Sequence, residues 1–189
     1  MCFNFEVSIG TFLFSWIISI YLLNKELNNE QKNNIILLMI FSSIQLADAI
    51  LWYNGMKKNN INYITTSFII PFILSLQILF NVYIRNNNKN PFITLFVISS
   101  ILYIFIGFNG YSTPLCNNKL SSPVWGSKEI MIYELVVFSI LILFPINNQT
   151  KDRIIILIAG IIAIMIGGAY GSLWCAIANI IAFYYLYKY

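Results

Sequence analysis

Polar and ionisable side chains interrupt an otherwise apolar run at IQLADAILW, residues 44–52. Gln45, Asp48 and Trp52 stand at positions i, i+3 and i+7, which share one face of an α-helix. A carboxylate at membrane depth costs roughly 3 kcal/mol or more, so such residues usually face the bundle interior or a wet cavity. The stripe predicts a proton- or cation-binding group at Asp48. The alternative is that Asp48 is protonated or hydrogen-bonded as glue between helices.

A second acid, Glu134, lies in another apolar run. Both acids fall in the outer third of their runs, Asp48 about 9 Å from the outer end at about 1.5 Å per residue. Two carboxyl groups that share a low-dielectric site hold a proton or a cation between them. We therefore expect Glu134 to be the partner of Asp48, and the alternative is an interfacial residue that reaches the headgroups.

The last apolar run repeats the same spacing, with Ser172, Cys175 and Asn179 at i, i+3 and i+7 and with Trp174 beside them. Gln77 and Asn81 add an i, i+4 pair in the inner half of a third run, and they suggest a polar path towards the cytoplasm or bonds between helices. Tryptophan at the outer boundary is also explained by an aromatic belt. The expected pocket consists of Gln45, Asp48, Trp52, Glu134, Ser172 and Trp174, and the belt of Trp52, Trp125 and Trp174.

Cys2, Cys116 and Cys175 all map to the outer side or the outer third. Three cysteines on an oxidising side allow one disulfide and leave one thiol, with the pairing open. The chain contains no histidine, and its cysteines and acids have no recognisable ligand spacing, so we expect neither a metal nor a cofactor.

The composition explains why these residues are anomalous. Hydrophobic residues make up 59% of the 189 residues and charged ones 10%, against roughly 25% charged in a soluble domain. The mean hydropathy is +0.75. These values predict a single all-α bundle of membrane-spanning helices. Basic residues stand singly or in pairs in short connections, which argues against nucleic-acid binding.

The apolar runs predict seven spans. A span needs about 20 residues, and the final run of about 34 residues is too long for one helix across a core of about 30 Å. The GGAYG sequence at 167–171 is the expected turn within it. Six spans, with a long tilted last helix, is the alternative. The expected spans are 6–23, 35–54, 62–84, 91–109, 129–146, 154–168 and 171–187.

Loop lysine and arginine residues set the orientation. The side that holds the connections after the first, third and fifth spans carries more of them, so it is the expected cytoplasmic side. The N-terminus is then outside, with Glu6 and no basic n-region before the first run, and the C-terminus is cytoplasmic.

Three function classes follow. The first is a small transporter, channel or ligand-binding membrane protein with the outer pocket, which would take a proton, a cation or a small ligand. The second is a structural or assembly protein of a membrane, which for a viral protein is a host or virion membrane; an oligomer is possible. The third is a lipid-acting enzyme with an acid pair. The sequence favours a non-enzyme, because neither a His-based triad nor a phosphate-binding loop is present.

Three short motifs resemble an uncharacterised family of small multi-pass membrane proteins of bacteria and giant DNA viruses. They are the MCF start, Gln-x-x-acid-x-x-x-Trp in the second span and Ser-x-Trp-Cys in the last span. The bacterial pattern usually has Glu-Gly where this chain has Asp48 and Ala49. The resemblance implies no reaction, but its motifs coincide with the outer-third features above. The matching residues are Met1, Cys2, Phe3, Ser8, Gln45, Asp48, Trp52, Ser172, Trp174 and Cys175.

Overall fold

The computed structural model describes residues 4–116, 121–126, 132–143 and 170–189, and these are mostly helical. The elements labelled η are π-helical segments within longer helices. In chain order the elements are α1 (Phe5–Leu23), α2 (Asn29–Ser42), α3 (Ile44–Tyr53), α4 (Asn60–Ile64), η1 (Thr65–Ile69), α5 (Ile70–Leu79), η2 (Phe80–Arg85), α6 (Pro91–Gly107), β1 (Thr113–Cys116), β2 (Ser121–Val124), α7 (Ile132–Leu143) and α9 (Tyr170–Lys188).

Three continuous helices are long and apolar enough to cross a membrane: Phe5–Leu23, Asn29–Tyr53 and Asn60–Arg85. They match the first three predicted spans. The fourth run forms the shorter apolar helix α6, and α7 and α9 lie within the fifth and last runs. The predicted span 154–168 lies outside the described residues.

Asparagine caps begin these helices. Asn4, Asn28, Asn59 and Asn90 each accept a hydrogen bond from a backbone N–H in the first turn that follows. Asn28 also forms a capping box with Gln31, which starts α2 well before residue 35, where the apolar run begins. The second helix is therefore longer than the apolar run that predicted it.

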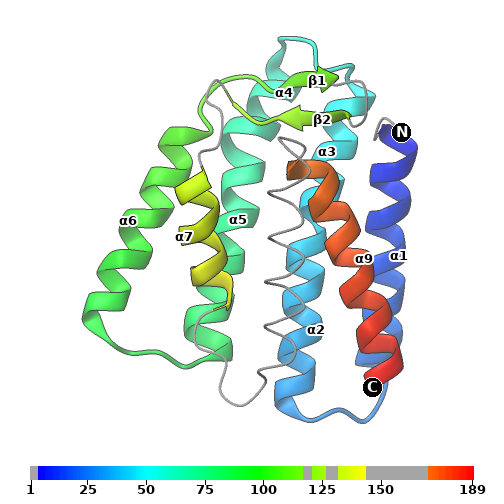
Figure 1. The fold of residues 1–189 in the computed structure, drawn as a ribbon, viewed down its shortest axis with the longest axis vertical. Helices are drawn as coiled ribbons and strands as arrows, with labels where there is room; N and C mark the ends of the chain where they lie inside the picture. Colours follow the sequence, from blue (N-terminus) through cyan, green and yellow to red (C-terminus); the bar gives the residue numbers. More distant parts are fainter. Residues whose placement is uncertain (1–3, 117–120, 127–131, 144–169) are drawn as a thin grey trace.

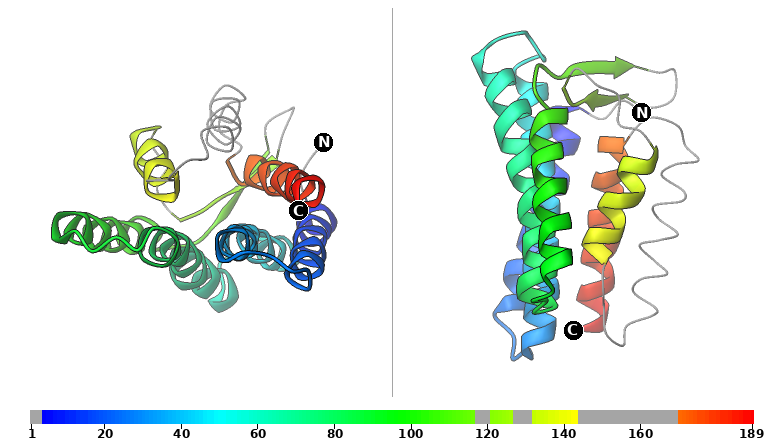
Figure 2. Two further views of the ribbon diagram at one scale, coloured as in Figure 1. Left: turned by 90° about the horizontal axis from the view of Figure 1, so that it is seen from below. Right: turned by 90° about the vertical axis from the view of Figure 1, so that its left-hand side faces the viewer.

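The helices stand side by side with their ends at two levels (Figure 1). We call the level with the start of α1, the α3–α4 turn and β1–β2 the hairpin end; α9 finishes at the opposite end. Seen end-on, α6, α5, α2–α3 and α1 form a curved row, and α7 and α9 lie on the same side of it (Figure 2). The packing of α5 on α6, of α2 on α5 and of α1 on α2, α3 and α9 agrees with this view.

Three buried apolar clusters hold the described bundle. One joins α1, α2 and α9 through residues such as Leu22, Ile35 and Ala182. A second joins α3 to α5 at the hairpin end and includes Trp125, and a third joins α5 and η2 to α6 and α7. Burying a side chain of this size stabilises a protein in water by about 1.5–3 kcal/mol. Within lipid the same contacts act through close packing instead.

Buried polar side chains link the helices between these clusters. Ser15 donates a hydrogen bond to Asn179 of α9 at 3.1 Å, and Asn81 donates from Nδ2 to the Leu141 carbonyl oxygen of α7 at 2.8 Å. Ser8, Ser15 and Ser19 are all buried in α1, where small residues allow close approach of neighbouring helices. Asn179 and Asn81 therefore act as links between helices in this structure.

Pro71 follows the first π-helical segment. Proline has no N–H, and its ring clashes with the carbonyl four residues earlier in a regular α-helix. The chain widens over Thr65–Ile69, where the Ile70 N–H donates to the Thr65 carbonyl oxygen five residues back. The helix continues to Arg85 with the proline inside it, so Pro71 does not end the span.

The long connection between the fourth and fifth runs forms a β-hairpin, an exception to the all-α prediction. β1 and β2 pair antiparallel, with Pro114 opposite Pro123. The hairpin lies across the end of the bundle, and β2 packs beside α9 (Figure 1).

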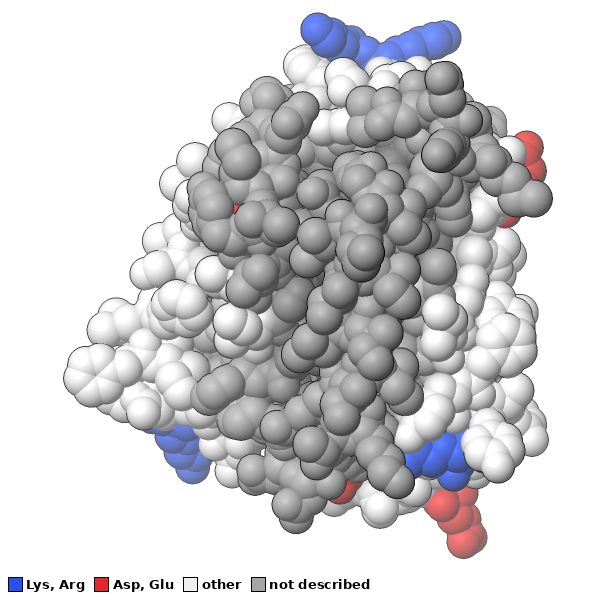
Figure 3. Space-filling view, in the orientation of Figure 1, with Lys and Arg blue, Asp and Glu red and all other residues white. Residues whose placement is uncertain are grey.

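Charge is distributed as a membrane protein requires. The described Lys and Arg side chains lie at the two ends of the bundle, and the described surface between them on this face is largely uncharged (Figure 3). Large apolar side chains of the helices are exposed, among them Ile17, Phe92 and Ile106 at 65%, 80% and 76%. A surface of this kind suits lipid.

Candidate functional site

Asp48 lies inside α3 near the hairpin end and is 1% exposed. Its carboxylate oxygen Oδ1 accepts a hydrogen bond from Nε1 of Trp125 at 2.8 Å. Trp125 directly follows β2 and is itself 4% exposed. Within the described residues, no Lys or Arg forms an ion pair with Asp48. The carboxyl group is thus buried beneath an indole ring with a neutral donor as its partner.

Two serines lie where the helix is interrupted, just before this site. Ser42 ends α2, and Ser43 separates it from α3. Both hydroxyls donate to the Met39 carbonyl oxygen, at 3.1 and 2.8 Å. Back-bonding of this kind competes with the helical hydrogen bonds and bends helices. The interruption of the regular α-helix at Ser43 falls directly before Gln45 and Asp48, and α3 then continues to Tyr53.

A buried asparagine fixes the chain that leads into the hairpin. Asn62 of α4 donates from Nδ2 to the Ser112 carbonyl oxygen at 2.9 Å and accepts from the Ser112 N–H at 2.8 Å. Thr66 adds a bond to the Asn62 side chain at 3.0 Å and one to the Ser112 hydroxyl at 2.7 Å. All three residues are fully buried. Asn62 pairs with Ser112 as a neighbouring strand would, and we call this group the Asn62 latch.

Ser67 extends the attachment by one turn. Its hydroxyl donates to the Gly110 carbonyl oxygen at 3.2 Å and accepts from the Gly110 N–H at 3.0 Å. The segment between α6 and β1 is therefore held along α4 and η1 immediately before the hairpin begins.

Gly126 holds the other side of the hairpin against α6. It has a φ of +81°, and a Cβ there would lie 3.1 Å from the Phe108 Cα atom and 3.3 Å from the Gly107 carbonyl oxygen. The Phe108 and Trp125 rings are neighbours, with centroids 6.1 Å apart. The latch and this glycine contact together place the indole over Asp48.

We expect Gly126→Ala to lower the free energy of unfolding by about 2–4 kcal/mol, because it combines left-handed strain with a backbone clash. Gly55 is the matched control: it has a φ of +61°, and its added Cβ would meet only Lys57 Cε at 4.0 Å. Gly55→Ala should cost only about 1–2 kcal/mol. Reversible unfolding in mixed micelles measures both, and equal costs would contradict the close contact at Gly126.

The other members of the predicted stripe, Gln45 and Trp52, differ from each other in burial and in their contacts. Gln45 is fully buried one turn before it. Trp52 is half-buried against the cluster that contains Trp125, and its Nε1 has no hydrogen-bond partner among the described residues. Trp52 thus contributes apolar contact to this region.

Glu134 is not joined to Asp48 by a hydrogen bond or ion pair. It is half-buried in α7 and accepts a hydrogen bond from the Tyr103 hydroxyl of α6. α7 packs on α5 and η2, whereas Asp48 meets Trp125 from the hairpin. The structure therefore gives the two carboxyl groups different partners and does not bond them to each other. A shared site for Asp48 and Glu134 stays a prediction.

The remaining predicted residues fall where side chains are not described. Ser172, Trp174 and Cys175 lie on the early turns of α9, and Cys116 ends β1, but the positions of their side chains lie outside the described part of the structure. Cys2 also lies outside it. The expected disulfide thus stays a prediction. Among the described residues no group of three His, Cys, Asp or Glu side chains could hold a metal ion.

Further polar groups lie deeper in the bundle, on α5. Gln77 is fully buried, and neither its Oε1 nor its Nε2 has a hydrogen-bond partner among the described residues; the same is true of the Ser75 hydroxyl, at 5% exposure. α2 packs on α5 and η2. Buried polar atoms that lack protein partners commonly bind ordered water or ions. Gln77 and Ser75 precede Asn81 of η2 along the same long helix.

Trp125 is the residue that the sequence reasoning assigned differently, as part of an interfacial belt. Its burial and its bond to Asp48 show another role. The sequence did contain a signal for this contact. The predicted topology puts Trp125 near the outer boundary and Asp48 in the outer third of its span, and a buried carboxyl group needs an N–H or O–H donor.

No family model, curated protein or solved structure matches the chain. The function is therefore argued from the geometry of Asp48 and its surroundings.

Proposed function

We propose that this protein binds and moves a proton or a small cation across a membrane, with Asp48 as the binding group. The observation that carries the proposal is the burial of the Asp48 carboxyl inside a candidate span with a neutral indole N–H as its partner. An isolated carboxylate in such surroundings is strongly unfavourable. A bound proton or cation neutralises the carboxylate. The buried surroundings of Asp48 therefore favour the state in which a proton or cation is bound.

The polar interior supports a route to and from this group. Gln45 lies one turn along the same helix, and Gln77 and Ser75 carry buried polar atoms without partners among the described residues. Such groups suit ordered water, which relays protons and hydrates cations. We propose that the route continues towards Asn81 at the opposite end.

The proposal includes the finer topology of seven spans with the N-terminus outside. Its support is the opposite placement of the start of α1 and the end of α9, which suits an odd number of crossings (Figure 1). It also includes membership of the uncharacterised multi-pass family, which rests on the motifs around Gln45, Asp48 and Trp52.

Proteoliposome flux with a pH-sensitive dye or a cation indicator inside the vesicles tests the proposal. Wild-type protein should dissipate an imposed gradient. Asp48→Asn should reduce the flux towards that of empty vesicles, because the amide takes up no proton and carries no negative charge to hold a cation. Glu134→Gln is the matched control: it alters another acid in an apolar helix that is hydrogen-bonded elsewhere. Equal flux from wild type and a correctly folded Asp48→Asn would remove Asp48 from the mechanism.

A structural membrane protein is the second candidate, favoured by one observation: Trp125 lies over Asp48 in a closely packed apolar cluster. In that case Asp48 serves to attach the hairpin. Wild-type vesicles would then show no flux, while Asp48→Asn would lower stability or the integrity of an oligomer. The same preparations therefore distinguish the two functions.

A further inference from the structure

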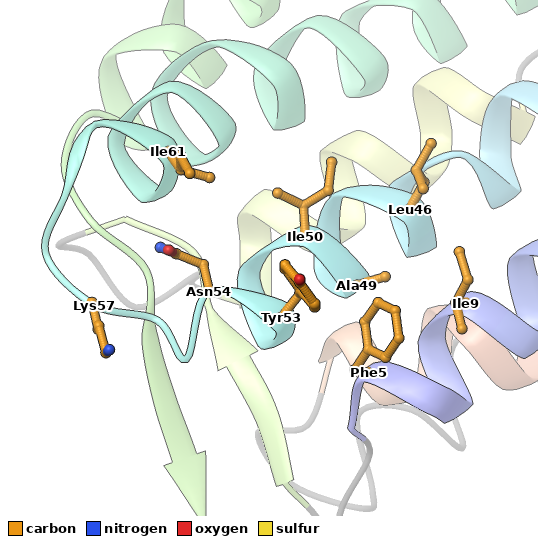
Figure 4. Close-up of a pocket in the computed structure, with 9 residues that line it drawn as sticks. All are labelled: Phe5, Ile9, Leu46, Ala49, Ile50, Tyr53, Asn54, Lys57 and Ile61. Atoms are coloured by element: carbon orange, nitrogen blue, oxygen red, sulfur yellow. The ribbon is translucent and has the colours of Figure 1, made fainter.

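An open groove of about 490 Å³ crosses the outside of the bundle where α1, α3 and α4 meet, near the hairpin end (Figure 4). Leu46, Ala49, Ile50 and Tyr53 line it along α3. Their spacing of i, i+3, i+4 and i+7 makes one continuous helix face of about 10 Å. Alanine in the middle of this face leaves the depression.

The other lining residues are apolar except Asn54 and Lys57, which follow α3 at one end of the groove. Phe5 and Ile9 of α1 lie on one side and Ile61 of α4 on the other. The Phe5 and Tyr53 rings have centroids 5.5 Å apart and together form one wall. All these apolar residues belong to the three helices that are long and apolar enough to cross a membrane. The groove therefore faces the region that lipid chains occupy.

A basic side chain stands at one end of the groove. Among the residues that the structure describes, Lys57 is the only charged one that lines it, and it lies in the connection between the second and third of these helices. Lys58 follows it but does not line the groove. Neither Glu6, which follows Phe5, nor Asp48, which precedes Ala49, lines it. A connection between spans lies at the level of the lipid headgroups, where lysine attracts anionic lipids.

We infer that this groove binds one anionic phospholipid, with an acyl chain along the α3 face and the phosphate beside Lys57. The apolar linings match the chain, and the lysine matches the headgroup charge. The inference depends on the chain lying in a membrane, and it is independent of any flux through Asp48.

Native mass spectrometry of the purified full chain in detergent tests the headgroup contact. Phosphatidylglycerol and phosphatidylcholine with identical acyl chains are titrated separately. Wild type should prefer phosphatidylglycerol, and Lys57→Ala should weaken its binding about fivefold, the effect of about one kcal/mol per lysine near a membrane surface. Lys58→Ala, the matched control from the same connection, should change it less than twofold. Equal losses from the two variants, or no headgroup preference in wild type, would overturn the inference.

A second pair of variants tests the chain contact. Leu46 is 37% exposed and lines the groove, whereas Leu13 of α1 is 48% exposed and does not. Leu46→Trp should fill part of the groove and weaken phosphatidylglycerol binding, while Leu13→Trp should leave it unchanged. Unaltered binding to Leu46→Trp would place the lipid elsewhere and overturn the site.

Discussion

Trp125→Ala is expected to lower the free energy of unfolding by about 4 kcal/mol or more. Removal of a buried tryptophan side chain typically costs 3–5 kcal/mol through the cavity that it leaves. Here it also removes the indole N–H that donates to Asp48 at 2.8 Å. The loss is measured by reversible unfolding in mixed micelles, with circular dichroism to confirm that the helices are retained before unfolding.

Trp125→Phe separates the hydrogen bond from the packing. It keeps most of the ring contacts and should cost about 1–3 kcal/mol, the usual effect of leaving a buried polar group without its partner. Trp16→Phe is a matched control, because the Trp16 Nε1 is buried and has no hydrogen-bond partner among the described residues. It should be neutral or slightly stabilising. A Trp125→Phe variant as stable as wild type would show that the bond to Asp48 contributes nothing.

Asn62→Ala is expected to cost about 3 kcal/mol or more and to release the hairpin. The Asn62 side chain satisfies both the N–H and the carbonyl of Ser112 and also bonds to Thr66, all in a buried place. Each buried group left without a partner costs about 1–3 kcal/mol. Hydrogen exchange should rise over residues 108–126, because the segment that carries Trp125 loses its attachment.

Asn54→Ala is the comparison for the Asn62 latch. Asn54 exchanges two side-chain hydrogen bonds with Asn59, at 2.8 and 2.9 Å, but it is only partly buried. Water replaces a partner at such a position, so the expected cost is about 1 kcal/mol. If exchange over 108–126 stayed at the wild-type level in Asn62→Ala, the latch would not hold the hairpin.

The helices were predictable because a span must be long and apolar throughout, and this signal survives without knowledge of neighbours. The start of α2 was placed too late, since a capping box at Asn28 and Gln31 extends the helix through polar residues. The hairpin was not predicted because Pro114 and Pro123 argue against strands. In the structure these two prolines face each other in a two-stranded ribbon, where both strands are edges.

The partners of Asp48 and Glu134 depended on which helices are neighbours, and sequence spacing contains no such information. Depth and periodicity selected two acids at similar height, yet one bonds to Trp125 from the hairpin and the other to Tyr103 of α6. The stripe of Gln45 and Asp48 needed only the helical period, and both residues are buried. Features within one helix could be predicted from the sequence, whereas contacts between elements could not.

The bond between Trp125 and Asp48 joins residues 77 positions apart, and this separation has a consequence during synthesis. A ribosome that adds about 5–20 residues per second needs roughly 4–15 s to pass from one to the other. During that interval the acid of the second helix lacks its final donor, and insertion into a membrane disfavours a carboxylate by up to about 3 kcal/mol, the cost at the helix centre. Completion of the hairpin is therefore a late step in biogenesis. In chains stalled before residue 125, we expect the second helix to be less stable than in the full chain, because Asp48 lacks the hydrogen bond from Trp125.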